Sequence, residues 1–346
     1  MKNKKNLIYI AGPTGIGKTE ISIKIAEILK TEIVSCDSRQ LFKELKIGTS
    51  PPSKDQLSRI KHHFIHSRSI HEIYNVGMYE KDAINIINKL FKNYNNLILV
   101  GGSGLYADSI LKGLDEFPSV PNKIRNNIKE KYIKEGIEYL QNKIKMLDPI
   151  YYKNVDVNNS NRLIRALELI ELTGKKYSSM ISGKRKTRDF NMNVILLECS
   201  REKLYSQINT RVDRMINNGL ENEAFSLKKF KHLNSLNTVG YKEFFNYFEN
   251  KISYEETVNK IKQNTRNYAK RQITWFKKYS ESQKINIENK KNIDFNKIPS
   301  LSKEILEKLN KFKPNNLYDA GKISGITPSA LFQIIKHKKV KGTKVA

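Results

Sequence analysis

The segment from residue 7 to residue 19 carries the strongest chemical signal in this sequence. It reads Leu-Ile-Tyr-Ile-Ala-Gly-Pro-Thr-Gly-Ile-Gly-Lys-Thr, so an apolar run precedes Gly-x-x-x-x-Gly-Lys-Thr. Apolar residues at helical spacing follow, which completes the strand, glycine-rich loop and helix of a P-loop. Such a loop binds a di- or triphosphate through backbone amides and the positive end of the helix. The predicted phosphate-binding residues are Gly12, Pro13, Thr14, Gly15, Ile16, Gly17, Lys18 and Thr19.

Two side chains of this loop have separate expected tasks. Lys18 would reach an outer phosphate oxygen, and the Thr19 hydroxyl would be a ligand of Mg²⁺. The motif alone does not say whether the bound phosphate is hydrolysed.

Asp37 follows the next predicted strand, residues 32–35, within Cys36-Asp37-Ser38-Arg39-Gln40. Ligands of open α/β sheets bind at the carboxyl ends of the strands, so Asp37 is expected near the phosphates. An N-cap of the following helical turn is the alternative function of this side chain.

The third predicted strand, residues 96–100, ends in Gly101-Gly102-Ser103-Gly104-Leu105-Tyr106. P-loop hydrolases usually place an aspartate here to help hold Mg²⁺, and this sequence has none. The loop therefore favours binding of a departing diphosphate over a motor or switch NTPase.

Charge points to a polyanionic partner. The 346 residues include 63 Lys+Arg and 35 Asp+Glu, a net charge of +28, and nucleic acid is the first candidate. A lysine bias from an AT-rich genome is the alternative explanation of this excess. Cys36 and Cys199 are the only cysteines, too few for a four-thiolate zinc site or a disulfide framework. With no signal-peptide core and no membrane-spanning apolar run, we expect a cytoplasmic protein without membrane contact.

The apolar patterns predict an α/β fold with a P-loop NTPase-like parallel sheet core, a helical insertion domain and a helical C-terminal region. A fourth strand is expected at 193–198, and helices at 83–91, 124–132, 137–147, 162–172 and 254–279. The expected divisions are core at 1–117, insertion at 118–190, return to the core and C-terminal helices at 191–280, polar linker at 281–316, and basic helical tail at 317–346.

Several basic or titratable side chains have two interpretations. Arg162 and Arg165 share a helix face and would either follow a phosphate backbone or be solvated. Lys270, Arg271 and Trp275 suit nucleic-acid contact, and core packing of Trp275 is the alternative. His62 and His66 have metal-ligand spacing, but loop packing or substrate positioning is favoured.

Taken together and in order, these motifs resemble the tRNA dimethylallyltransferase (tRNA isopentenyltransferase) family from about residue 7 to residue 278. The shared motifs are Gly12–Thr19, Asp37-Ser38-Arg39-Gln40, Ile47-Gly48-Thr49, His62-His63, Gly101–Tyr106, Asn161–Ala166, Val239-Gly240-Tyr241 and Lys270–Trp275. The resemblance implies transfer of a dimethylallyl group from dimethylallyl diphosphate to N6 of adenosine 37 of tRNA, next to the anticodon.

The resemblance also implies residue roles. Asp37 would be the general base, Arg211 would stabilise the departing diphosphate, and Thr19 would lie beside Mg²⁺. The target base would be flipped out of the anticodon stem-loop. Positions expected to contact tRNA are Asp37, Ser38, Arg39, Gln40, Ser103, Arg125, Asn161, Arg162, Arg165, Lys242, Lys270 and Arg271. A monomer is expected.

Residues 317–342 are similar to the C-terminal tail of the flavoprotein that modifies the tRNA wobble uridine, which implies an appended tRNA-binding tail. An ordinary basic helical end is the alternative. Three rival functions remain at this point: a small-molecule P-loop kinase, an isopentenyltransferase acting on free adenine nucleotides, and an RNA-binding protein with a relic P-loop.

Overall fold

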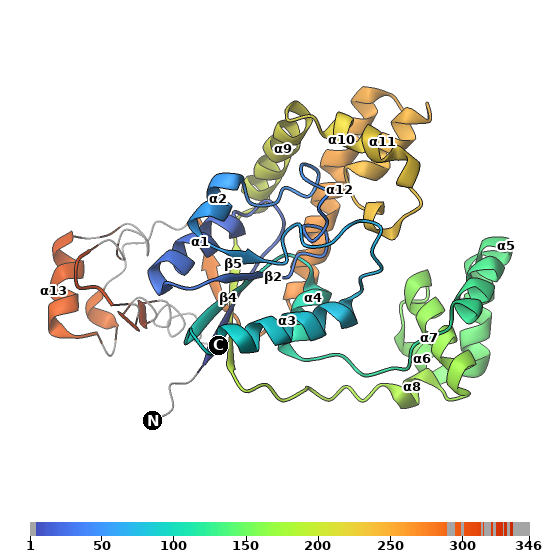
Figure 1. Ribbon diagram of the computed structural model, residues 1–346, viewed down its shortest axis with the longest axis horizontal. Coiled ribbons are helices and arrows are strands. Elements are labelled where there is room, and N and C mark those ends of the chain that lie inside the picture. Colours follow the sequence, from blue (N-terminus) through green and yellow to red (C-terminus); the bar gives the residue numbers. More distant parts are fainter. Residues whose placement is uncertain are drawn as a thin grey trace, which may run out of the picture. The chain divides into compact units, whose positions relative to one another are not determined.

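The computed structural model describes residues 5–288, 295–298 and 301–312, together with residues 314, 320, 323–327, 329–330 and 333–334. The chain separates into two compact units (Figure 1). We call Met1–Leu111 with Arg188–Ala346 the core unit, and Lys112–Thr187 the insertion unit. The sequence analysis set the insertion at residues 118–190.

The described part of the core unit contains a six-stranded parallel sheet in the order β3-β2-β4-β1-β5-β6. The α/β parallel-sheet prediction is confirmed. The strands are β1 (Asn6–Ala11), β2 (Ile33–Ser35), β3 (His62–His63), β4 (Asn96–Val100), β5 (Asn191–Glu198) and β6 (Gln283–Asn286). In the register, Tyr9 on β1 lies opposite Leu99 on β4 and Val194 on β5.

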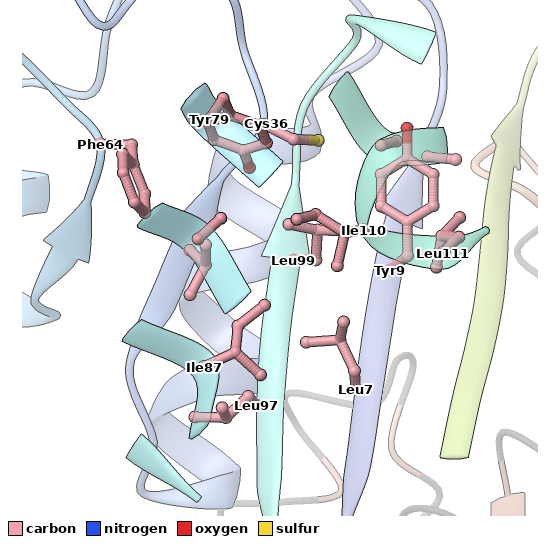
Figure 2. Close-up of a cluster of buried hydrophobic side chains, with 14 of the residues drawn as sticks. Leu7, Tyr9, Cys36, Phe64, Tyr79, Ile87, Leu97, Leu99, Ile110 and Leu111 are labelled. Atoms are coloured by element: carbon pink, nitrogen blue, oxygen red, sulfur yellow. The ribbon is translucent and has the colours of Figure 1, made fainter. Parts of the chain in front are cut away.

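Alternate residues of β1 pack into two different hydrophobic clusters. Leu7 and Tyr9 pack with α3 (Val76–Leu90) and α4 (Gly104–Leu111), as Figure 2 shows for Ile87 and Ile110. Ile8 and Ile10 pack on the other face with α1 (Lys18–Leu29) and α9 (Arg201–Asn217). Period-two alternation thus buries both faces of the strand, which is why its sequence is a continuous apolar run.

The described part of the core unit contains further helical elements. They are α2 (Lys54–Arg59), α10 (Leu220–Leu227), η1 (Lys228–Phe230), η2 (Asn234–Leu236), α11 (Tyr241–Phe248), α12 (Tyr254–Phe276), η3 (Phe295–Lys297) and α13 (Lys303–Phe312). Residues of α9, α10, α11 and α12 form a third cluster with Phe42 and Leu45.

The insertion unit is helical, with its own buried cluster. It comprises α5 (Asn122–Leu147), α6 (Pro149–Asn154), α7 (Ser160–Thr173) and α8 (Tyr177–Met180). Gly136 has φ of 75° inside α5, so the helix consists of two segments that meet there. The sequence analysis had likewise placed two helices on either side of this glycine.

The segment 281–316, expected as a polar linker, contains regular structure. β6 pairs with β5, with Gln283 opposite Ile195. Backbone groups make this pairing, so a polar strand leaves no apolar pattern in the sequence. Ile305 and Leu309 on α13 are buried in a cluster that also includes Ile28 of α1. Much of the tail predicted at 317–346 lies outside the described residues; Ala320, Ala330 and Ile334 are buried in the same cluster.

Candidate active site

The loop between β1 and α1 has P-loop geometry. Gly15 and Gly17 have φ of 85° and 92°, a region that favours glycine. A Cβ at Gly15 would lie 2.9 Å from the Ile208 side chain, so α9 packs closely on the loop. Gly17 caps α1, whose first residue is Lys18. The predicted sequence of strand, loop and helix is present, with α1 directing its amino end at the loop.

The Lys18 ammonium lies over this loop. Nζ donates hydrogen bonds to the carbonyl oxygens of Gly12 at 2.8 Å and Pro13 at 2.9 Å. Burial lowers the pKa of Lys18 to about 8; Asp37 opposes this effect and Arg211 adds to it. A cation whose charge is this poorly solvated favours an anionic ligand.

Arg211 reaches the loop from α9. Its Nη1 donates to the Thr14 hydroxyl at 2.9 Å, while the buried Nε has no partner among the described residues. Burial lowers the pKa of Arg211, and the Asp37 carboxylate counteracts that effect. Gln207, Arg211 and Arg214 follow one another at i, i+4 and i+7, which places them on one helix face. All three line the same cavity.

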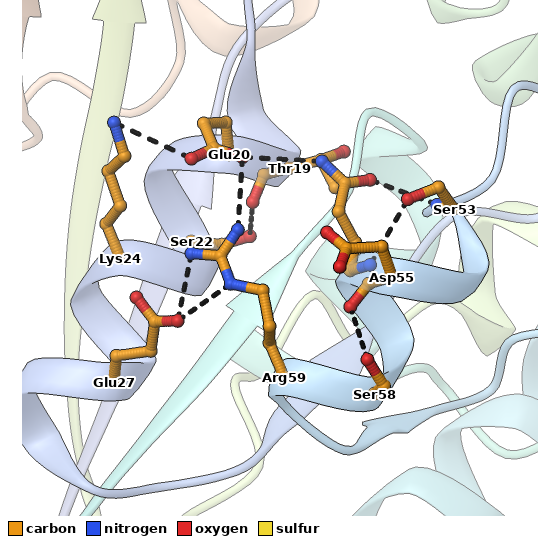
Figure 3. Close-up of polar contacts among 10 residues, drawn as sticks. Thr19, Glu20, Ser22, Lys24, Glu27, Ser53, Asp55, Ser58 and Arg59 are labelled. Atoms are coloured by element: carbon orange, nitrogen blue, oxygen red, sulfur yellow. Dashed lines mark hydrogen bonds and ion pairs between the residues drawn. The ribbon is translucent and has the colours of Figure 1, made fainter.

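That cavity, which we call the phosphate cavity, has a volume of about 360 Å³. Its wall includes Lys18, Thr19, Asp37, His62 and Arg211. α2 contributes Gln56 to the wall and is fixed to α1 beside Thr19 (Figure 3). Arg59 pairs with Glu27 at 2.9 Å, and Ser53 and Gln56 form a capping box. The cavity therefore gathers the cationic and hydroxyl side chains expected of a diphosphate site.

A second cavity of about 370 Å³ adjoins the first, and we call it the acceptor cavity. Thr14, Asp37, Arg211 and Tyr268 line both cavities. The acceptor wall includes residues from segments expected to contact tRNA, namely Ser38, Arg39, Thr238, Val239, Gly240, Lys242 and Arg271. Gly48, Thr49, Val212 and Thr265, from outside those segments, also line it. Asp37 therefore lies where a group bound in the phosphate cavity would be next to a group bound in the acceptor cavity.

Asp37 has a fixed carboxylate. Its Oδ1 accepts hydrogen bonds from the backbone amides of Arg39 at 2.9 Å and Gln40 at 3.3 Å. Oδ2 accepts none from the described residues. The side chain therefore caps the following turn, as the alternative interpretation expected, and it also lines both cavities. One oxygen orients the group and the other is left for a ligand.

Sequence reasoning did not single out Gln272 or Tyr268, two residues of α12. Gln272 Oε1 accepts from the Thr14 amide at 2.8 Å, and its Nε2 donates to the Gly102 carbonyl at 2.8 Å. Burial and the Asp37 charge raise the pKa of Tyr268 to about 12. Gln272 lies within the Lys270–Trp275 motif and Tyr268 precedes it by four residues on the same helix face, and this spacing was the available signal.

The glycines after β4 explain how α12 approaches the P-loop. A Cβ at Gly102 would lie 2.2 Å from Gln272 Nε2, and one at Gly104 would lie 2.2 Å from Trp275 Nε1. Trp275 packs against the core cluster and Phe276 is buried within it. Trp275 therefore packs against the core, which the sequence analysis gave as the alternative to nucleic-acid contact. Lys270 and Arg271, on the same helix, are exposed.

Other predicted RNA-contact residues of the core unit bind protein groups. Arg39 donates to the carbonyl oxygens of Asn234 at 2.9 Å, Ser235 at 3.1 Å and Asn237 at 3.2 Å. Gln40 donates to the carbonyls of Thr49 and Ser50. Ser103 donates to the Ser38 hydroxyl at 3.0 Å. Arg39 and Gln40 hold the loops that form the acceptor cavity, and Lys242 contributes an exposed ammonium to its wall.

Predicted RNA-contact residues of the insertion unit lie on α5 and α7. Arg125 and Arg165 both pair with Glu168, at 2.9 Å and 3.2 Å. Asn161 and Arg162 are exposed at the start of α7. The unit thus presents a cluster of arginines on one pair of helices.

A divalent metal fits the phosphate cavity as a shared ligand of protein and diphosphate. No group of three or more His, Cys, Asp or Glu side chains suited to a metal occurs among the described residues. Mg²⁺ needs no such cage, because it keeps several waters and binds one or two protein oxygens plus phosphates. The Thr19 hydroxyl supplies such an oxygen in this cavity, as the sequence analysis expected.

The histidines do not form a metal site in the described structure. His62 Nδ1 pairs with the Ile60 carbonyl at 2.8 Å, and His63 Nε2 pairs with Glu32 at 2.6 Å. Burial lowers the pKa of both His62 and His66. His62 contributes to the wall of the phosphate cavity. Among the described helices, none is long and apolar enough to cross a membrane.

Two family models match the chain. The model described as IPP transferase matches residues 40–279, and the model described as the C-terminal helical bundle of the tRNA modifying enzyme MnmG/GidA matches residues 278–345. The second match confirms the resemblance noted for the tail and extends it toward the N-terminus.

Curated relatives share about half of their residues with this chain. The tRNA dimethylallyltransferase of Christiangramia forsetii is 51% identical over 288 residues, which is 83% of this chain and 95% of the relative. That of Flavobacterium johnsoniae is 49% identical over 280 residues, covering 79% and 91%.

Solved structures have the same fold. The tRNA isopentenylpyrophosphate transferase of Bacillus halodurans has a TM-score of 0.61 at 31% identity, covering 85% of this chain and 93% of that one. A eukaryotic dimethylallyltransferase acting on tRNA has a TM-score of 0.68 at 23% identity, covering 99% and 87%, which shows similarity of fold.

Proposed function

The chain belongs to the IPP transferase family, and we propose that it transfers a dimethylallyl group from dimethylallyl diphosphate to N6 of adenosine 37 in tRNA. The observation that carries this proposal is the position of Asp37 in the wall shared by two cavities. One cavity has cations for a diphosphate, and the other has room for a nucleobase among polar loop residues. The absence of an acid after β4 argues against the rival kinase.

The diphosphate half of the substrate would bind to the P-loop amides, Lys18 and Arg211. Arg211 Nη1 donates a hydrogen bond to the Thr14 hydroxyl. Its Nε has no partner among the described residues and could donate to an oxygen of the departing diphosphate. Stabilising charge as it develops on that oxygen is worth about 3–4 kcal/mol in comparable sites. The Thr19 hydroxyl would help to hold Mg²⁺, which would neutralise part of the diphosphate charge when bound.

The reaction forms one bond and breaks one. N6 of the adenine attacks the allylic carbon, the carbon–oxygen bond breaks, and diphosphate leaves with the bonding electrons. The proton on N6 passes to the Asp37 carboxylate, whose Oδ1 is held by two backbone amides. General base catalysis of this kind contributes about 10²–10⁴ in rate. A flipped-out base would be needed, because N6 lies inside the stack otherwise.

The tRNA is proposed to contact both units of the chain. In the core unit the exposed Lys242, Lys270 and Arg271 support this assignment, and in the insertion unit the arginines of α5 and α7 do so. We further propose that the protein acts as a monomer, since residues of one chain line both cavities, and in the cytoplasm with its tRNA substrate.

We call residues 278–345, which match the second family model, the C-terminal addition, and propose that it binds a second region of the tRNA. Residues 301–346 contain ten lysines and three acidic residues, so this region is strongly basic. The matching family model describes part of another tRNA modifying enzyme. The addition packs through its apolar cluster against Ile28 of α1, which attaches it to the core unit.

A transfer assay tests the main proposal. Purified protein, Mg²⁺ and dimethylallyl diphosphate are mixed with unmodified tRNA that has adenosine at position 37, and the digested tRNA is analysed by mass. We expect N6-dimethylallyl adenosine with the wild type. Asp37→Asn keeps an oxygen for the amides of Arg39 and Gln40 but is a far weaker base, so the rate should fall by about 10² or more.

Controls separate this result from misfolding and from the rivals. Asp55→Asn, an exposed substitution on α2, should leave the rate unchanged. The Asp37→Asn protein should still bind tRNA with the wild-type affinity. Product with AMP in place of tRNA would favour the free-nucleotide transferase, and tRNA binding without any transfer by the wild type would refute the proposed reaction.

A further inference from the structure

Glu168 is a buried acid in the middle of an apolar helix face. It lies on α7 between Leu167 and Leu169, and only 6% of its side chain is exposed. A carboxylate is costly to bury, and an apolar residue of similar volume is often as stable or more stable at such a place. Packing of the insertion unit therefore gives no reason for an acid here.

The two arginines that pair with Glu168 come from different helices. Arg125 Nε donates to Oε1 at 2.9 Å from the first turn of α5, and Arg165 Nη1 donates to Oε2 at 3.2 Å from α7. Each carboxylate oxygen thus fixes one guanidinium. Both arginine side chains are more than one-third exposed, at 37% and 39%, whereas the carboxylate lies on their buried side.

Each guanidinium has N–H donors that are not used by Glu168. An arginine has five N–H groups in a planar fork, and a single one is used on Glu168 by each. The three side chains together carry a net charge of +1. This arrangement presents preorganised donors and positive charge to an anion with two or more oxygens, such as an RNA phosphate.

Aromatic rings lie beside the arginines. The Arg165 guanidinium is 5.7 Å from the centre of the Phe117 ring. Phe117 in turn stacks on Tyr177 with ring centres 5.6 Å apart and an interplanar angle of 29°. Burial raises the pKa of Tyr177; Arg165 and Arg162 counteract the rise, and Asp115 adds to it. Arginine next to stacked rings is the composition of surfaces that bind unpaired RNA bases.

We propose that Glu168 is the positioning residue of an RNA-binding platform in the insertion unit. Its carboxylate orients Arg125 and Arg165 toward a backbone phosphate of a single-stranded RNA loop, and Phe117 with Tyr177 stacks on a neighbouring base. The proposal rests on the proposed function, because that function supplies the RNA loop.

The test uses the whole protein with Glu168→Gln, which keeps the shape of the side chain and removes its charge. Glu171→Gln, an exposed change on the same helix, is the matched control. The probe is a synthetic anticodon stem-loop RNA, labelled for anisotropy, with 2-aminopurine in the loop. We expect about tenfold weaker RNA binding and a tenfold higher KM for tRNA, with kcat and the KM for dimethylallyl diphosphate unchanged.

Two further variants keep the proposal testable if Glu168→Gln unfolds the unit. Arg165→Lys retains the charge but loses the planar fork, so RNA binding should weaken without a change of melting temperature. Phe117→Leu should abolish the quenching of 2-aminopurine. Wild-type affinity in folded Glu168→Gln protein, or a fall of kcat alone, would overturn the assignment. Stem-loop binding is measured without turnover, so absence of transfer by the wild type would count against the proposed function only.

Discussion

Gln272 on α12 accepts a hydrogen bond from the backbone amide of Thr14, 258 residues away in the sequence, at 2.8 Å. Its amide nitrogen donates to the Gly102 carbonyl, also at 2.8 Å. One side chain therefore fixes the P-loop relative to the loop after β4. Both loops line the phosphate cavity, so their spacing sets the shape of the diphosphate site.

Replacing Gln272 with leucine should weaken the site without removing any charge. The substitution preserves volume but leaves the Thr14 amide and the Gly102 carbonyl without partners. An unpaired buried polar group costs about 1–3 kcal/mol, so kcat/KM for dimethylallyl diphosphate should fall by about 10- to 100-fold. Steady-state kinetics at saturating tRNA measure this. Gln263→Leu, an exposed change on the same helix, should have no such effect.

Substrate binding should depend on pH through Lys18. Burial lowers the pKa of its ammonium to about 8, so the free enzyme loses this charge as the pH rises through that value. The diphosphate requires the cation, and hence the KM for dimethylallyl diphosphate should be flat below pH 7 and rise toward tenfold per pH unit above pH 8. Lys24 is a half-buried lysine on the same helix, and Lys24→Ala should leave the pH dependence of this KM unchanged. A constant KM up to pH 10 would contradict the assignment.

The chemistry of the core site was readable from the sequence because it lies in local patterns. Continuous apolar runs marked β1, β2, β4 and β5, and the residues after them supplied the P-loop and Asp37. What the sequence did not reveal depends on long-range packing. Gln272 connects the loops after β1 and β4 only because α12 crosses both of them. The Arg39 guanidinium donates hydrogen bonds to backbone carbonyls that lie nearly two hundred residues away in the sequence. Backbone partners leave no trace in residue types.

The same limit applies to strands and glycines. β6 is a polar strand at the sheet edge, and only its backbone pairing with β5 defines it. Gly102 and Gly104 were taken as parts of a motif, but their reason is steric, since α12 side chains occupy the space of a Cβ at both positions.

The basic C-terminal addition should affect whole tRNA and not its anticodon arm. The variant replaces Lys336, Lys338 and Lys339 with glutamate, three residues that belong to none of the motifs assigned to the active site. We expect the KM for full-length tRNA to rise about tenfold and its salt dependence to become shallower, because fewer phosphates are neutralised. The KM for an isolated anticodon stem-loop should be unchanged. An equal loss with both RNAs, or no loss with either, would contradict a second binding region.

A methyl group at Gly104 should lower the stability of the protein and, through α12, weaken diphosphate binding. Gly104 is the first residue of α4, and a Cβ there would lie 2.2 Å from Trp275 Nε1 and 2.3 Å from its Cδ1. The indole has little room to move, because it packs on the core cluster and the Lys278 ammonium lies 3.5 Å from its ring centre. Overpacking of this kind costs about 1–3 kcal/mol, so Gly104→Ala should lower the free energy of unfolding by that amount in denaturant titrations. Gly77→Ala in α3, where the only near atom is Asn75 Oδ1 at 3.3 Å, should cost much less than Gly104→Ala. Because α12 carries both Trp275 and Gln272, Gly104→Ala should also raise the KM for dimethylallyl diphosphate. Destabilisation without any change of this KM would show that α12 adjusts independently of the phosphate cavity.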